Sequence, residues 1–128
     1  MTFTNENGNA KPIQHPEGFQ YAPTAVLRNV KIGKGTKIWH YVNAYDCVIG
    51  ENSMIGTYTE IQDDVKIGNN TRIQSHSFLC ALVTVGNNVF VGHGVKTIND
   101  VKPPTADKTK WKPTTIKDCA VIGSNVTL

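Results

Sequence analysis

Aliphatic side chains recur every six residues through most of this chain, and this period restricts the fold more than any other feature. The first column comprises Val26, Ile32, Ile38, Ala44 and, after a one-residue deletion, Ile49, Ile55, Ile61, Ile67, Ile73, Leu79, Val85, Val91 and Thr97, then Ile116, Ile122 and Leu128. A six-residue period fits neither the α-helix nor the two-residue alternation of a single strand. It is typical of a parallel β-helix, in which short strands form the walls of each coil and equivalent residues stack.

Two further columns accompany the aliphatic one. Four residues after most first-column positions comes a small or β-branched residue, such as Thr36, Ser53 or Thr71, which we expect inside the coil. Three residues after each first-column position, Gly, Asn or Asp is common, as at Gly35, Asn52, Asp64, Asn70, Asn88, Gly94 and Asn125. These residue types tolerate positive φ, so they predict the turns between walls. Tyr41, Tyr58, His76 and Leu82 depart from this preference, and such departures are where functional residues are expected.

The repeat divides the chain into an arm, a β-helix and a loop. Residues 1–20 are polar without a period and are expected to form a disordered arm, whereas residues 21–128 are expected to form one β-helix domain. The segment 98–115 contains three prolines and no hexad, so it is predicted to protrude as a loop.

Composition excludes several classes of protein. The three cysteines have no metal-type spacing, which favours a reducing cytoplasm. A net charge of +3 is too small to indicate nucleic-acid binding. The sequence has no signal peptide or apolar span of membrane length, so no membrane association is expected.

The hexad, an aliphatic residue followed by Gly and then a small residue, resembles the repeat of the hexapeptide-repeat acyltransferases. Within that superfamily, the segments 38–40, 72–76, 89–95 and 98–100 resemble the branch that N-acetylates nucleotide-linked amino sugars. The resemblance implies a left-handed β-helix, a homotrimer, acetyl-coenzyme A (acetyl-CoA) as cosubstrate and a nucleotide-sugar acceptor destined for bacterial surface polysaccharide, such as lipopolysaccharide. Relatives continue for several coils beyond the position of Leu128, so this chain is expected to lack their C-terminal coils. No coenzyme-binding residue is assigned.

Acetyl transfer from a thioester requires a neutral, well-positioned amine, a proton acceptor and hydrogen-bond donors for the developing oxyanion. His76 and His93 are seventeen positions apart, about one coil, so both are expected on one edge. Asn99 and Asp100 begin the loop and are expected close to His93. With the resemblance, these positions predict catalytic roles for His76 and Asn99. They predict substrate binding, without a metal, by Gln74, His93, Asp100, Lys110 and Trp111.

Other interpretations stay open. An outward histidine in a turn is often an ordinary surface residue, Asn99-Asp100 can simply cap the loop exit, and lysines in a loop are often only solvated. A γ-type carbonic anhydrase would need three histidine ligands with a His-x-x-x-x-His pair, which this chain lacks. The stronger alternative is a shortened trimeric scaffold whose coenzyme site is incomplete.

Overall fold

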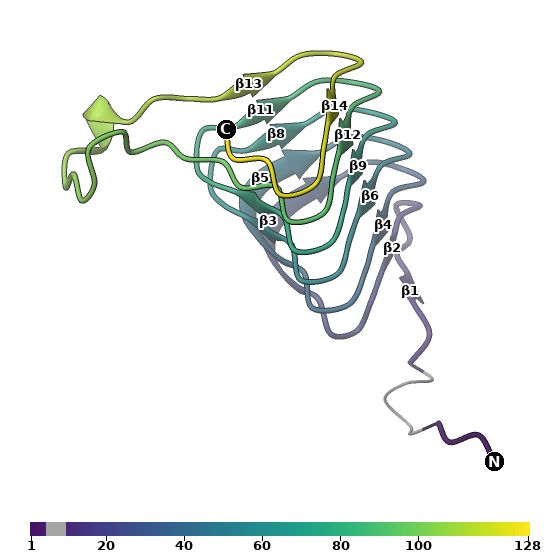
Figure 1. The fold of residues 1–128 in the computed structure, drawn as a ribbon. Helices are drawn as coiled ribbons and strands as arrows, with labels where there is room; N and C mark the ends of the chain where they lie inside the picture. The colour runs from purple at the N-terminus through teal and green to yellow at the C-terminus, as the bar shows by residue number, and fades with distance from the viewer. Residues whose placement is uncertain (5–9) are drawn as a thin grey trace.

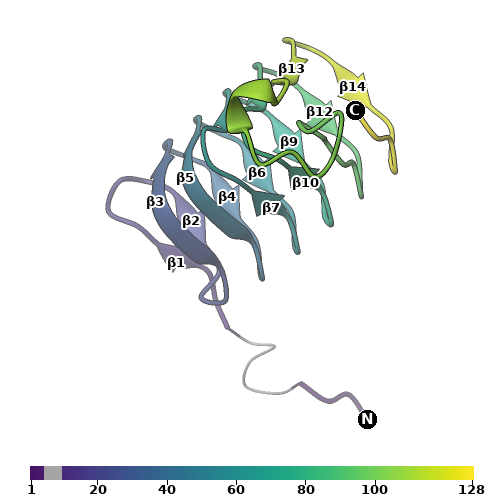
Figure 2. The same cartoon turned by 90° about the vertical axis from the view of Figure 1, so that its left-hand side faces the viewer.

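The computed structural model describes residues 1–4 and 10–128, and its coils stack as a parallel β-helix with three walls (Figures 1 and 2). Wall 1 is built from β2 (Gln20–Tyr21), β4 (Lys37–Ile38), β6 (Met54–Ile55), β9 (Arg72–Ile73), β12 (Phe90–Val91) and β14 (Val121–Ile122). Wall 2 contains β7 (Glu60–Ile61) and β10 (Phe78–Leu79), and wall 3 contains β8 (Lys66–Ile67), β11 (Thr84–Val85) and β13 (Thr115–Ile116). The longer strands β3 (Val26–Ile32) and β5 (Asn43–Ile49) run through both walls 2 and 3. The predicted all-β, parallel β-helix fold is confirmed, and its left hand stays a prediction.

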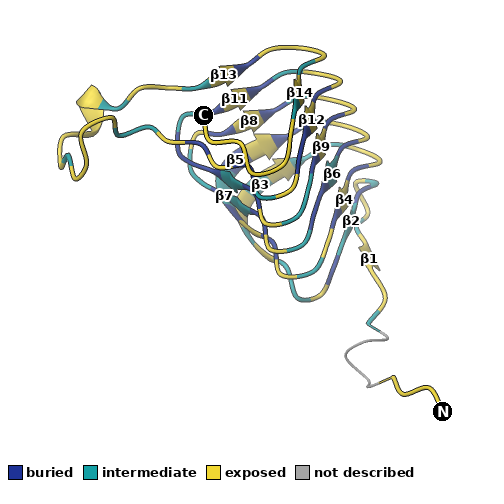
Figure 3. Cartoon of the chain, in the orientation of Figure 1, coloured by how far each residue is buried: buried dark blue, intermediate teal, exposed yellow. Residues whose placement is uncertain are grey.

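Most first-column residues are buried and form the core, and Figure 3 shows buried segments in dark blue along the walls of the coils. Ile55, Ile73 and Val91 are fully buried and stand in register on successive coils of wall 1. Because each aliphatic side chain packs on its equivalents above and below, the apolar surface is removed from water continuously along the axis.

The second column contributes buried hydroxyls that are fully used. Thr36 Oγ1 donates to the carbonyl of Gly50 at 2.6 Å and accepts the backbone N–H of Ser53 at 3.0 Å. Ser53 Oγ repeats the pattern one coil later, donating to Gly68 O at 2.9 Å and accepting from Thr71 N at 3.1 Å. Hydrogen-bonded hydroxyls cost little to bury, so the column can be polar inside an apolar core.

The turn column adopts the predicted backbone conformation at every corner. Asn52, Asn70 and Asn88 have φ between 52° and 56° at the corner between walls 3 and 1. The residues that depart from the Gly, Asn or Asp preference share this conformation, with φ of 58° at Tyr41, 61° at Tyr58, 61° at His76 and 75° at Leu82. A β-helix turn therefore imposes left-handed φ on whatever residue occupies it, and these residues carry its steric cost.

The register differs from the prediction in the first coil. Val26 is 63% exposed, and its neighbour Leu27 pairs with the buried Ala44 instead. The step from Leu27 to Ile32 is thus a five-residue repeat, like the predicted one from Ala44 to Ile49. Adjacent aliphatic residues at 26 and 27 concealed this second deletion from the sequence pattern.

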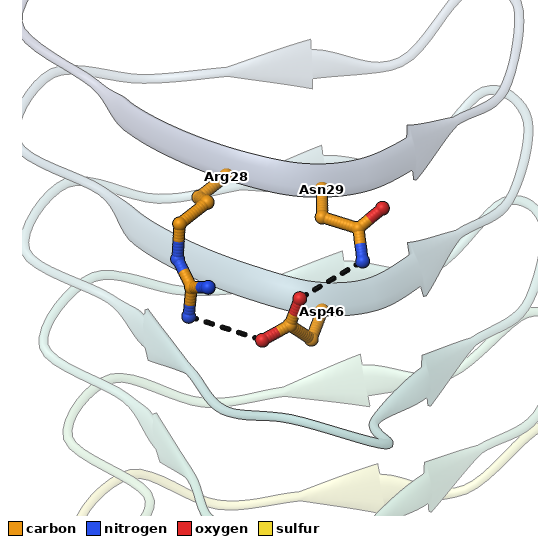
Figure 4. Close-up of polar contacts among 3 residues, drawn as sticks. All are labelled: Arg28, Asn29 and Asp46. Carbon is orange, nitrogen blue, oxygen red and sulfur yellow. Dashed lines mark hydrogen bonds and ion pairs between the residues drawn. The ribbon is translucent and has the colours of Figure 1, made fainter.

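The two short repeats lie one above the other and share a polar contact at their turns (Figure 4). Asp46 accepts hydrogen bonds from Arg28 Nη2 at 3.0 Å and from Asn29 Nδ2 at 2.9 Å. Asn29 and Asp46 are themselves turn residues, with φ of 52° and 48°. Both deletions therefore fall before the same corner, and the stacking of the walls is kept.

The N-terminal segment and the loop lie at opposite ends of the solenoid. From Ile13 onward, the segment expected to be a disordered arm pairs with the first coil, because β1 (Ile13–Gln14) is antiparallel to β2. The expected loop leaves wall 2 after Thr97 and re-enters wall 3 at Thr115. It contains one short 3₁₀ helix, η2 (Lys108–Lys110), and projects from the coils at the left of Figure 1.

The cysteines give a direct test of the core. Burial raises the pKa of the Cys47 thiol to about 12, with the nearby Asp46 charge adding to the shift, and burial also raises the pKa of Cys80. Cys119 is exposed at a turn. Because the thiolate is the reactive form, we expect a disulfide reagent at pH 8 to modify Cys119 in the native protein, with Cys47 and Cys80 reacting only after denaturation. Peptide mass mapping checks this, and rapid native labelling of Cys47 would contradict the assigned core.

Candidate functional site

Two of the three corners carry the residues singled out by the sequence. The histidine corner joins wall 1 to wall 2 and is defined by the stacked turn residues Tyr41, Tyr58, His76 and Gly94 with the residues before them, His40, Thr57, Ser75 and His93. The loop corner joins wall 2 to wall 3 and is the point from which residues 98–114 project. In Figure 1 the histidine corner is at the bottom and the loop at the left.

Aromatic rings stack along the histidine corner. Tyr41 and Tyr58 are stacked with ring centroids 5.3 Å apart, and Tyr58 lies 5.1 Å from the His76 ring. The positive φ that the turn imposes directs each of these side chains out of the coil, and all three residues are exposed. His76 therefore presents to solvent an imidazole, whose two ring nitrogens can donate and accept hydrogen bonds.

His93 lies beside His76 on the next coil. Its Nδ1 is 2.9 Å from Ser75 Oγ, and its backbone N–H donates to Ser124 Oγ at 3.2 Å. The ring is thus oriented by the coil below while the residue stays exposed. Gln74, half-buried, precedes the same turn by two residues. The structure therefore brings together three of the predicted site residues: Gln74, His76 and His93.

Lys96 is a member of this corner that the sequence analysis missed. Its Nζ donates to the carbonyl of His76 at 2.6 Å and to that of Gly94 at 3.1 Å. An ammonium group has a third proton to donate, so Lys96 places a positive charge beside the two histidines. Its place on wall 2, two residues after a histidine-corner turn, was the available signal.

The start of the loop is held by its own backbone. Asn99 Nδ2 donates to Ala81 O at 3.2 Å, and Asn99 O accepts the backbone N–H of Lys112 at 2.7 Å. The Asp100 carboxylate accepts N–H groups from Thr105 at 2.7 Å and Lys102 at 3.1 Å. The hydrogen bond from Thr105 is the main cause that lowers the pKa of Asp100. These two side chains hold the start of the loop in this conformation, and the roles predicted for them in the reaction stay predictions.

The tip of the loop combines positive charge with an aromatic ring. Lys108 Nζ lies 5.4 Å from the centre of the Trp111 ring, while Lys110 is exposed. The indole Nε1 of Trp111 is buried and has no hydrogen-bond partner among the described residues. A buried N–H without an acceptor is costly, so an acceptor from outside this chain would stabilise the loop.

The residues of the histidine corner and those of the loop lie apart within one chain. Wall 2 separates the histidine corner from the loop corner, and six residues of extended chain span roughly 20 Å. The expected closeness of Asn99 to His93 is therefore not seen within one chain, although only a few residues lie between them in sequence. The residues between them form the wall itself, where Lys96 bridges to Phe78.

No group of three or more His, Cys, Asp or Glu side chains in residues 1–4 and 10–128 is arranged to hold a metal ion. In the same part of the chain, no helix has the length and apolar character needed to cross a membrane.

Comparisons with known proteins agree with the repeat. The family model "Bacterial transferase hexapeptide (six repeats)" matches residues 46–81. The chain is 32% identical to "Bifunctional protein GlmU" of Ralstonia nicotianae, over 88% of this chain and 27% of that protein. It is 35% identical to the protein of the same name from Mycolicibacterium vanbaalenii, over 59% of this chain and 17% of that protein. The chain thus spans about a quarter or less of the length of these curated relatives.

A solved structure resembles the fold closely. The acetyltransferase domain of PglB from Neisseria gonorrhoeae aligns with a TM-score of 0.73 at 13% identity, over 88% of this chain and 49% of that one. The same domain has been solved in complex with acetyl-CoA, and that structure aligns with a TM-score of 0.70. At this level of identity the likeness establishes a shared fold.

Proposed function

Since the chain belongs to the hexapeptide-repeat acyltransferase superfamily, we propose that it is an acetyl-CoA-dependent N-acetyltransferase that acts on a nucleotide-linked amino sugar. The observation that carries the proposal is the histidine corner, where His76 and His93 stand exposed on successive coils. Acetyl-CoA binding by the PglB domain supports the choice of cosubstrate. The acceptor is inferred from the resemblance of residues 72–76 and 89–95 to the amino-sugar branch.

The chemistry places modest demands on the protein. The neutral amine attacks the thioester carbonyl, the new C–N bond forms, and the C–S bond breaks to release the coenzyme thiolate. The amine loses one proton, which His76 accepts or the departing thiolate takes up. A histidine acting as general base contributes about 10²–10⁴ in rate. His93 and Gln74, on the same corner, are then placed to orient the sugar.

The loop reaches the reaction through a second copy of the chain. The loop corner and the histidine corner lie roughly 20 Å apart in one chain, six residues along wall 2. In a closed symmetric trimer, the loop of one chain can lie against the histidine corner of the next, because heterologous contacts close into a ring. The proposed site is therefore composite, with Lys110 and Trp111 supplied by the neighbour. An oxygen of the neighbour or of the substrate would satisfy Trp111 Nε1, which has no partner in the part of the chain that the structure describes.

We place this reaction in the cytoplasm, where it would supply an acetylated nucleotide sugar for surface polysaccharide such as lipopolysaccharide.

The decisive experiment measures acetyl transfer directly. Purified protein is incubated with acetyl-CoA and a panel of nucleotide-linked amino sugars, and coenzyme release is followed together with the product mass. We expect at least one amino sugar to gain one acetyl group, whereas its already acetylated counterpart gives no turnover. Calorimetry with acetyl-CoA alone provides the second readout. The absence of both turnover and acetyl-CoA binding would refute the proposal and would favour the incomplete, non-catalytic scaffold.

A further inference from the structure

A cavity of about 330 Å³ lies on the outer surface of wall 1, at the N-terminal end of the solenoid. The N-terminal segment contributes Ala10 and Pro12, the first coil contributes Gln20, and the second coil contributes Lys37, Trp39 and His40. Its volume lies within the range of small-molecule sites, which combine an apolar lining with a few polar groups. Of the histidine corner only His40 lines it, and none of Gln74, His76, His93, Lys110 and Trp111 does.

The aromatic wall of the cavity is the Trp39 indole. This side chain is 47% exposed, although a tryptophan is costly to leave in water. Ala10 and Pro12 add an apolar surface without hydrogen-bonding side chains. An exposed indole in an apolar cavity is suited to stacking with a flat heteroaromatic ring, as aromatic side chains do with nucleobases.

The polar groups of the cavity suit the edge of such a ring. Thr24 Oγ1 lies 2.7 Å from His40 Nδ1 and also accepts the backbone N–H of Tyr41 at 3.2 Å. Because the Thr24 hydroxyl has no other acceptor among the described residues, we assign its proton to the hydrogen bond with Nδ1. His40 then carries its own proton on Nε2, as a donor. The Gln20 amide offers both a donor and an acceptor, so the pair matches a base with a carbonyl beside a ring N–H.

Charge and position extend the match to phosphates. Lys37, exposed beside Trp39, provides a cation for a phosphate group. His40 also begins the column of the histidine corner that continues through Thr57 and Ser75 to His93. Three coils at the spacing of paired strands cover about 14 Å. A ribose, a diphosphate and a sugar ring in series can span this distance, from the cavity to the histidines.

We propose that this cavity binds the base of a nucleoside diphosphate, stacked on Trp39 and with its phosphates near Lys37. The inference rests on the proposed function, because it identifies this nucleotide as the carrier of the amino-sugar acceptor. The pairing with His40 and Gln20 favours the oxo-bearing bases uracil, thymine and guanine. Coenzyme A also contains a base and a diphosphate, but its adenine lacks a carbonyl group.

Calorimetric titration tests the site without requiring turnover. Wild-type protein is titrated with UDP, dTDP and GDP, and separately with ADP and coenzyme A. We expect binding of at least one oxo-bearing diphosphate. Trp39→Ala should weaken it by about tenfold or more through lost stacking, and Trp39→Phe should retain most of the affinity. Lys37→Gln should weaken it by about tenfold through the lost charge, while Lys66→Gln, which removes an exposed lysine from the equivalent position of wall 3, should change nothing.

Two results would overturn the assignment. Equal affinities of wild type, Trp39→Ala and Lys37→Gln for the nucleotide would place its site elsewhere. Loss of coenzyme A binding in the two variants, with the binding of UDP, dTDP and GDP unchanged, would assign the cavity to the donor. Acetyl transfer is measured independently: turnover with unaffected variants would remove the cavity proposal alone, whereas nucleotide binding at Trp39 without any turnover would remove the catalytic proposal alone.

Discussion

Ile73→Asp is expected to prevent folding of the chain, whereas Asn70→Asp, three residues earlier, should leave the melting temperature nearly unchanged. Ile73 is fully buried between Ile55 and Val91, so the new carboxylate would stand in the apolar core without a partner. Burying an unpaired charge costs several kcal/mol, a large part of the roughly 5–15 kcal/mol that stabilises a typical domain. Asn70 is exposed at a turn with φ of 53°, and Asp also tolerates that conformation.

Thermal unfolding followed by circular dichroism compares the two variants. The pair is matched, because both changes introduce the same carboxylate, three residues apart, and the two positions differ in whether the side chain points into or out of the coil. Equal melting temperatures would mean that the inward column has been assigned to the wrong positions.

His76→Asn should lower the rate of acetyl transfer by about 10²–10⁴ while the fold stays intact. Asparagine is chosen because it tolerates the positive φ of this turn, 61°, and so removes the imidazole without adding backbone strain. The loss should fall on kcat, since the residue is assigned to proton transfer rather than to substrate affinity.

Cys119→Asn is the control for this change. Cys119 is exposed, has φ of 64°, and lies at the corner between walls 3 and 1, away from the histidines. Its replacement should alter neither kcat nor KM. Full activity of the His76→Asn variant would mean that the coenzyme thiolate accepts the proton and that His76 is an ordinary surface residue.

The repeat predicted the fold well because each of its columns has one physical cause. Burial selects the aliphatic column, limited space selects the small column, and left-handed φ favours Gly, Asn and Asp in the turn column. Tyr58 and His76 are not of these types, but the repeat places them in the turn column and they have the same positive φ. The register failed at Val26 and Leu27, where two adjacent aliphatic residues satisfy the same rule. Periodicity determines spacing, and it cannot choose between neighbours of equal hydrophobicity.

The candidate site was harder to predict than the fold. The grouping of His76 with His93 follows from the coil length, so it could be read from the sequence. The position of Asn99 could not be predicted in this way. The hexad places a residue on a wall or a corner only while the repeat continues, and the repeat is interrupted at the loop that Asn99 begins. The contacts of Lys96 and the cavity beside Trp39 depend on side-chain reach and on the path of the N-terminal segment, neither of which has a period.

Because the coils stack uniformly, equivalent positions along the histidine corner are evenly spaced. Any side chain moved along its column changes position in steps of about 4.8 Å, the distance between paired strands, and in no smaller increment. Insertion or removal of one whole coil would therefore lengthen or shorten the interval between the Trp39 cavity and His93 by one such step, with every local turn preserved. A solenoid of this kind can be fitted to a longer or shorter ligand by counting coils, without redesigning either end of its binding surface.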